Sequence, residues 1–143
     1  GADGIEFDKK GNLYVGNFGD GAVYKLTFDS EGNVATNEVW AQDRSQLLTT
    51  DGMIMDENGN LYIADFSANA VAMVTPDAKV TRLAQSPDCD GLDGGLDQPG
   101  EPIIWNGKLI LSCFDTVTAN CVNTAHEMPA TLAELDIFGD GEK

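Results

Sequence analysis

The sequence predicts an all-β fold built from a repeated unit of four strands, and two observations support this prediction. The first is an internal repeat, because residues 49–66, TTDGMIMDENGNLYIADF, are similar in sequence to residues 1–18. Of the 27 positions from 3 to 29, 12 are identical to the residue 48 positions later, where average composition would give roughly two. The second is a series of short apolar or alternating runs, separated by Gly, Asn and Asp, without a helical period.

The strands of each unit follow one another in order along the chain. In the first unit we expect strands at 4–7, 13–17, 22–28 and 38–40, and in the second at 52–55, 61–64, 70–74 and 80–83. Asn58-Gly59 predicts a tight hairpin between the first two strands of the second unit, because a primed turn needs positive φ. A third unit keeps the pattern with less identity, and its expected strands are 102–105, 109–112 and 132–137.

Four antiparallel strands in 48 residues describe one blade of a β-propeller. The chain is therefore expected to form one domain, residues 1–143, with blades at about 1–48, 49–96 and 97–143, the last one incomplete. Three blades do not close a ring, since propellers typically have four to eight. We expect half of a six-bladed ring, completed either by further blades of a longer chain or by a second copy.

The composition excludes several classes of function. A formal net charge of -16 argues against nucleic acids and anionic membrane surfaces as partners, and no apolar run is long enough for a transmembrane helix. His126 is the single histidine and lies in a polar loop, which argues against a Ser-His-Asp triad and a histidine-rich metal site. Cys113 and Cys121 could form a disulfide in an exported protein, so the compartment of this soluble chain, cytoplasmic or exported, stays open.

Propeller geometry indicates where a site would lie. If the first strand of each blade lines the channel, Asp3 and Asp51 enter it at the same height, and the second-strand ends at Asn17 and Asp65 share that face. The long segments 84–100 and 113–130 are expected to form a rim there. Converging carboxylates suit a hard divalent cation. The alternative is that each Asp only caps its Asp-Gly turn.

The segment 86–101, SPDCDGLDGGLDQPGE, belongs to the first of these long stretches. Its four aspartates alternate with glycines as in a calcium loop, but they lack the spacing of an EF-hand. A flexible lid is the other interpretation of this segment.

The segment TDGMIMDENGNLYIADF resembles the repeat unit of the gluconolactonase and senescence-marker-protein (regucalcin) family, whose members are six-bladed propellers. The order of the units is similar to the last three blades of that family. The resemblance implies one divalent cation in the channel, with Asp51 as a ligand and as the catalytic base. Asp3 matches an Asn of the family, which changes the charge of the site. Glu101, four residues before Trp105, resembles the Glu of the Gly-Glu motif in the first blade of that family, and it is therefore a further ligand candidate. The alternative is that Glu101 is only a loop residue before a proline.

The resemblance thus implies a metal-dependent hydrolase of small lactones or esters. The cation would be Ca²⁺, Zn²⁺, Mg²⁺ or Mn²⁺, which the sequence does not distinguish. The alternative is a non-enzymatic, NHL-like propeller that binds a partner or ligand through its channel face. A divalent ion on Asp51 would favour the enzyme, whereas an apolar face with aromatic side chains would favour the binding module.

Overall fold

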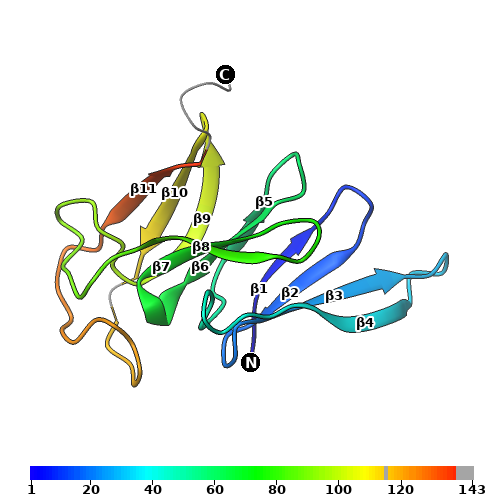
Figure 1. The fold of residues 1–143 in the computed structure, drawn as a ribbon, viewed down its shortest axis with the longest axis horizontal. Coiled ribbons are helices and arrows are strands. Elements are labelled where there is room, and N and C mark those ends of the chain that lie inside the picture. Colours follow the sequence, from blue (N-terminus) through cyan, green and yellow to red (C-terminus); the bar gives the residue numbers. More distant parts are fainter. Residues whose placement is uncertain (115, 138–143) are drawn as a thin grey trace.

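The computed structural model describes residues 1–114 and 116–137, which form three antiparallel sheets (Figure 1). The first sheet, in the order β1-β2-β3-β4, contains β1 (Ala2–Phe7), β2 (Leu13–Asn17), β3 (Ala22–Phe28) and β4 (Val34–Ala41). The second sheet contains β5 (Met53–Met55), β6 (Leu61–Asp65), β7 (Ala70–Val74) and β8 (Val80–Gln85), in the order β5-β6-β7-β8. The third contains β9 (Pro99–Trp105), β10 (Lys108–Cys113) and β11 (Leu132–Asp136), in the order β11-β10-β9.

The prediction of an all-β fold with three blades, the last one incomplete, is confirmed. Within the described residues the only helical turn is the short 3-10 helix η1 (Phe66–Ala68), which follows β6. The predicted ranges 13–17, 22–28 and 70–74 agree with β2, β3 and β7 to the residue. The largest difference is β4, which is five residues longer than the range 38–40 (eight residues against three).

The hairpin between β5 and β6 differs from the predicted primed turn. Of its turn residues only Gly59 has positive φ, at 86°, and Asn58 does not. The Asp56 carboxylate instead closes a longer loop, because it accepts hydrogen bonds from the backbone N–H groups of Asn58 and Asn60 at 2.9 and 2.8 Å. A side chain that accepts from its own turn replaces the second positive φ that a primed turn would need.

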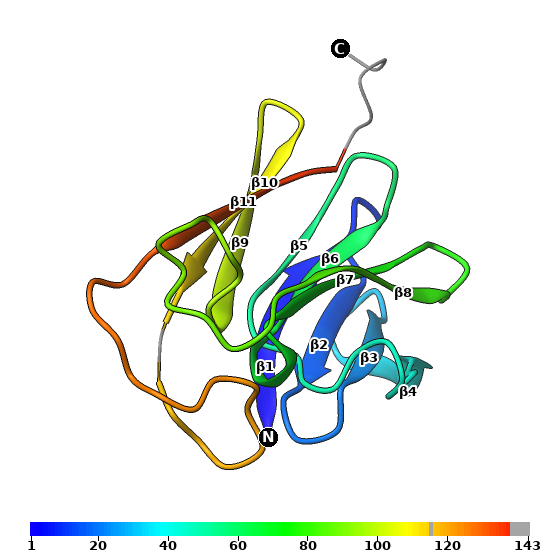
Figure 2. The same cartoon turned by 60° about the vertical axis from the view of Figure 1, so that its left-hand side comes forward.

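The same Asp-x-x-Gly-Asn turn occurs three times. Asp8 and Asp29 accept from the backbone of Asn12 and Asn33 as Asp56 does from Asn60, in each case at 2.8 or 2.9 Å. The β1–β2 and β5–β6 turns lie at the same end of their sheets as the β9–β10 turn, in both views (Figures 1 and 2). Much of the identity between the first two repeats is therefore turn chemistry at this end of the blades.

The second sheet lies between the other two and is buried on both faces. Alternate residues of β6 enter different cores, with Leu61 and Ile63 in the core shared with the first sheet and Tyr62 and Ala64 in the core shared with the third. All five residues of β6 are buried. Strand alternation thus explains why this strand reads as a continuous apolar run.

The outer faces of the first and third sheets carry exposed apolar side chains. On β1 these are Ile5 and Phe7, which are 66% and 56% exposed. On β9 they are Ile103 and Trp105, at 52% and 59%. Each flanking sheet therefore has one packed face and one face with unburied apolar area.

The first strands of the three sheets lie next to one another, since β1 contacts β5 and β5 contacts β9. This is the arrangement of channel-lining strands in a propeller. No helix in the described ranges 1–114 and 116–137 is long and apolar enough to cross a membrane.

Candidate functional site

Three acidic residues gather where the first strands begin. Asp3 lies in β1, Asp51 precedes β5 and Glu101 lies in β9, so each comes from a different sheet. Asp3 and Glu101 are exposed and Asp51 is half-buried. We call the end of the three sheets that bears these residues the carboxylate end. It is opposite the end with the Asp-x-x-Gly-Asn turns.

Glycines allow the three backbone segments that bear these acidic residues to approach one another closely. A β-carbon on Gly4 would overlap the carbonyl oxygen of Asp51. A β-carbon on Gly52 would overlap the Glu101 carboxylate and lie 2.6 Å from the carbonyl oxygen of Gly100. The backbone N–H of Gly52 donates to that carbonyl at 2.7 Å, which joins the second sheet to the third. The repeated Asp-Gly pair thus has a structural role through its glycine.

The charges of the three carboxylates act on one another. Burial, and after it the charge of Asp3, raises the pKa of Asp51 from 3.8 to about 6, and Glu101 adds to the rise. Burial and the charges of Asp3 and Glu6 raise the pKa of Glu101. The structure therefore brings together Asp3, Asp51 and Glu101, the ligand candidates predicted from the sequence. Their negative charges repel one another.

The donor atoms of this group suit a hard cation, because all are carboxylate oxygens. A bound cation would also relieve the repulsion that raises the pKa of Asp51. In the part of the chain that the structure describes, however, no group of three or more Asp, Glu, His or Cys side chains is arranged so that it could hold a metal ion. The chemistry fits a cation, while a complete set of ligands would need further oxygens.

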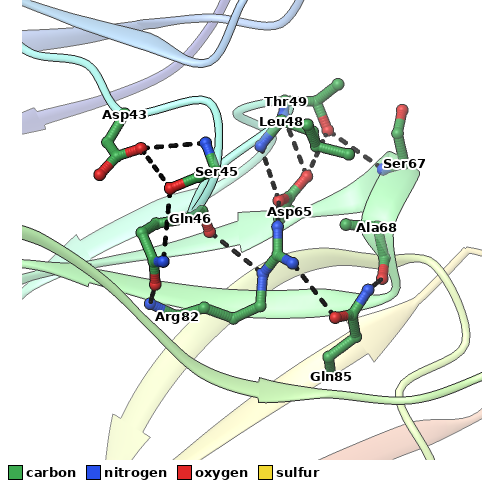
Figure 3. A network of polar contacts seen from close by, with 10 residues as sticks. All are labelled: Asp43, Ser45, Gln46, Leu48, Thr49, Asp65, Ser67, Ala68, Arg82 and Gln85. Atoms are coloured by element: carbon green, nitrogen blue, oxygen red, sulfur yellow. Dashed lines mark hydrogen bonds and ion pairs between the residues drawn. The ribbon is translucent and has the colours of Figure 1, made fainter.

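Asp65 has a structural role instead of a position on the channel face. It is fully buried and accepts from the backbone N–H groups of Leu48 at 2.8 Å and Thr49 at 3.0 Å, as Figure 3 shows. Arg82 reaches the same carboxylate at 3.5 Å. Asp65 thereby fixes the segment that leads into Asp51. Asn17, the equivalent residue of the first sheet, accepts from the N–H of Gly19 at 3.2 Å within a turn.

A pocket of about 490 Å³ opens beside Asp51 and Glu101. Its other walls include Phe18, Phe66 and Phe114, which follow β2, β6 and β10. The ring centroids of Phe18 and Phe66 are 5.7 Å apart, and those of Phe66 and Phe114 are 6.4 Å apart. The pocket therefore combines a carboxylate wall with an aromatic wall.

These phenylalanines are not among the site residues predicted from the sequence, although the repeat contains the signal. Phe66 lies 48 residues after Phe18, and Phe114 lies 48 residues after Phe66. The aromatic wall is thus one side chain per blade at equivalent positions. The low identity of the third unit concealed Phe114.

The two long connections, 86–98 and 114–131, contact one another. Thr124 donates its hydroxyl to the Asp88 carboxylate at 2.6 Å, and the Asn123 amide donates to Asp97 and to the carbonyl of Cys89. Phe114 and Thr118 of the second connection line the pocket beside Asp51. This connection therefore lies at the carboxylate end, in agreement with the rim position expected for it.

Two further expectations concern these connections. In the 86–98 segment, Asp90 and Asp93 accept from the backbone of Leu92 and Gly95, as turn residues do, and no metal-binding group of side chains is described there. The three cysteines are free, so the possible bridge between Cys113 and Cys121 is not formed. Instead, the Cys121 thiol contacts the Thr118 hydroxyl at 2.8 Å.

Comparison with known families gives one match. The model of the SMP-30/gluconolactonase/LRE-like region matches residues 1–90, which is more than half of the chain. Among curated proteins, none matches the sequence closely enough to count as a relative.

Solved structures support the same architecture. A luciferin-regenerating enzyme is similar with a TM-score of 0.75 at 14% identity, over 96% of this chain and 45% of that chain. Virginiamycin B lyase from Staphylococcus aureus is similar with a TM-score of 0.55 at 12% identity, over 96% of this chain and 41% of that one. A catalytically inactive variant of that lyase, with quinupristin, gives 0.56 at 11% identity, over 99% and 43%. The chain thus spans less than half the length of each of these proteins, and at such identities the likeness concerns the fold alone.

Proposed function

Because the chain belongs to the SMP-30/gluconolactonase/LRE-like family, we propose that the protein hydrolyses small lactones or esters at the carboxylate end, with Asp51 as the general base. The observation that supports this is the state of Asp51. It is a half-buried carboxylate beside two others, at a pocket large enough for a small molecule, and its pKa is raised to about 6. Without a bound cation, a base with this pKa is ionised at neutral pH and is more basic than an ordinary aspartate, and a cation on Asp51 would lower the pKa again.

In the proposed reaction, water adds to the carbonyl carbon of the substrate while Asp51 takes one proton from it. The tetrahedral adduct then expels the ester oxygen, which receives the proton from Asp51. A lactone thus gives a hydroxy acid, and Asp51 returns to its carboxylate form. Asp3 and Glu101 add negative charge beside Asp51, and this charge favours a bound cation. A divalent cation held by Asp3, Asp51 and Glu101, with further oxygens, would supply polarisation of the substrate carbonyl.

We further propose that additional propeller blades complete this site, supplied by a longer chain or by a second copy. The exposed apolar faces of the first and third sheets support this. The complete protein is therefore the material for the activity assay.

The test compares two substitutions of Asp51 in the complete protein with added Ca²⁺, Zn²⁺, Mg²⁺ or Mn²⁺. Asp51→Ala should abolish lactone hydrolysis while the blades stay folded. Asp51→Asn should keep part of the cation affinity, measured by calorimetry, and lose about 10²-fold or more of the rate, because it removes the base and preserves one oxygen. Hydrolysis at the wild-type rate in both variants would refute the proposed role.

The second candidate function is a non-enzymatic binding module, and the aromatic wall favours it. Three phenylalanines along one pocket are typical of a surface that holds a ligand by apolar contact. Under this alternative the protein binds a small ligand in the pocket and does not convert it. Absence of turnover with each of the four cations, together with measurable ligand binding, would select this alternative.

A further inference from the structure

We propose that the site selects a ligand with an apolar, aromatic-sized ring, and that it disfavours polyhydroxylated sugar lactones. This inference rests on the proposed function, because it names the substrate class of the same site. It follows from the aromatic wall formed by Phe18, Phe66 and Phe114 in the pocket that Asp51 and Glu101 also line.

The aromatic wall is a continuous row of side chains from three blades. Phe66 occupies its centre and is only 5% exposed, and its ring is tilted by 54° against that of Phe18 and by 51° against that of Phe114. Tilted rings at these separations are favourable aromatic contacts. Core packing therefore holds the centre of the row, which makes the wall a fixed surface.

Phe114 is the exposed end of the row. Its side chain is 68% exposed, although its backbone is anchored by an N–H that donates to the carbonyl of Gln98 at 3.0 Å. An exposed phenyl ring at the mouth of a pocket offers apolar area that a ligand can cover. A flat apolar ring would gain most from this contact, since it can stack on or against the phenyl edge.

The carboxylates of the pocket limit where polar groups of a ligand can lie. Asp51 and Glu101 present carboxylate oxygens, which suit a polarised carbonyl only with a cation between them. Those hydroxyl groups of a sugar lactone that lie against the phenyl rings would lose their hydrogen bonds to water, because the rings offer no acceptor. A ligand with a polar carbonyl end and an apolar ring matches both walls.

The experiment uses the complete protein and two probes, dihydrocoumarin, a lactone fused to a benzene ring, and glucono-δ-lactone, a sugar lactone. We expect kcat/KM to be higher for dihydrocoumarin. Phe114→Ala should lower kcat/KM for dihydrocoumarin by about tenfold, mainly through KM, and leave glucono-δ-lactone nearly unchanged. Phe28→Ala is the matched control, because Phe28 is also exposed, at 38%, but lies at the end of β3 and does not line the pocket.

The outcomes separate this inference from the proposed function. A preference for glucono-δ-lactone, or an equal effect of Phe114→Ala on both probes, would overturn the inference while the hydrolytic function stands. If neither lactone is hydrolysed, binding of dihydrocoumarin is measured by calorimetry. Binding that Phe114→Ala weakens and Phe28→Ala does not would support the inference and remove the proposed function. Binding that neither substitution changes would overturn the inference.

Discussion

The carboxylate of Glu101 lies over the α-carbon of Gly52, in the space that a β-carbon on Gly52 would occupy. Residues of the second and third sheets thus share one small volume at the carboxylate end. The hydrogen bond from the Gly52 N–H to the carbonyl of Gly100, at 2.7 Å, fixes this approach. The glycine of the repeated Asp-Gly pair therefore determines where Glu101 can lie relative to Asp51.

Gly52→Ala tests this relationship. The added methyl group would have to displace the Glu101 carboxylate and the backbone of β9, at a cost of about 1–3 kcal/mol. Urea unfolding should report this loss, and the hydrolytic rate should fall with it. Gly19→Ala is the control, because a β-carbon there meets nothing closer than 3.7 Å. Equal stability of the two variants would contradict the crowding at Gly52.

Asp51→Asn should stabilise the protein above pH 6. In the folded state the pKa of Asp51 is raised from 3.8 to about 6, so the proton is held more tightly than in the unfolded chain. This favourable contribution is complete below pH 3.8 and is lost as the pH rises through about 6. At pH 7.5 the variant should therefore gain on the order of 1 kcal/mol, a value reduced by solvent screening of the half-exposed group.

Thermal unfolding at several pH values measures this effect. The difference in Tm between Asp51→Asn and the wild type should be small at pH 4 and positive at pH 7.5, in a buffer with a chelator of divalent ions. A variant that is less stable than the wild type at pH 7.5 would show that the Asp51 carboxylate is held by favourable contacts instead of repulsion.

Asp65→Ala should destabilise the second sheet strongly. The substitution leaves the backbone N–H groups of Leu48 and Thr49 without their acceptor and removes the ion-pair partner of Arg82, at an expected cost of about 3–5 kcal/mol. Asp43→Ala, in the same region of Figure 3, should cost below about 1 kcal/mol, because Asp43 is exposed and bonds only within its own turn to Ser45. Urea unfolding of both variants measures the contrast, and equal losses would contradict the assigned role of Asp65.

Residues 1–143 alone should associate in solution through the exposed faces of the flanking sheets. Light scattering is expected to give a dimer or larger species, and Phe7→Lys and Trp105→Lys should each shift it towards the monomer, because they place a charge on the apolar faces. Val34→Lys, on the edge strand β4, serves as a control for added charge on an exposed residue. A wild-type chain that is monomeric at all concentrations would contradict the need for further blades.

Much of the fold could be predicted because the repeat and the strand pattern agree. The ranges of β2, β3 and β7 are predicted to the residue, since these strands are apolar or alternating runs and each begins directly after Gly or Asn. The length of β4 could not be predicted in this way. Six of its eight residues are exposed, so its pairing with β3 leaves little hydrophobic signal in the sequence.

The candidate site was predictable only in part. The spacing of Asp3 and Asp51 indicated their common end of the blades, because equivalent residues of a repeat occupy equivalent positions. The burial of Asp65 was not predictable from a motif, since it depends on the 48–49 backbone and on Arg82 from another strand. The Asn58-Gly59 pair suggested the wrong turn, because the motif disregards the Asp56 side chain two residues earlier.

The Asp-x-x-Gly-Asn turns have a consequence for how such a chain tolerates change. Most hydrogen bonds of each turn lie within five consecutive residues, Asp8 to Asn12 in the first hairpin, where a tyrosine of the following strand adds one more, from Tyr14 to Asp8. At the opposite end, bonds between separate segments add to the local turns: Asp65 holds the backbone of Leu48 and Thr49, and the Gly52 N–H donates to the carbonyl of Gly100 in the third sheet. The repeated turns and the candidate site residues thus lie at opposite ends of the same hairpins. Directed evolution of new reactions can randomise the ends of β2, β6 and β10 and leave the five-residue turns as the constant part of the library.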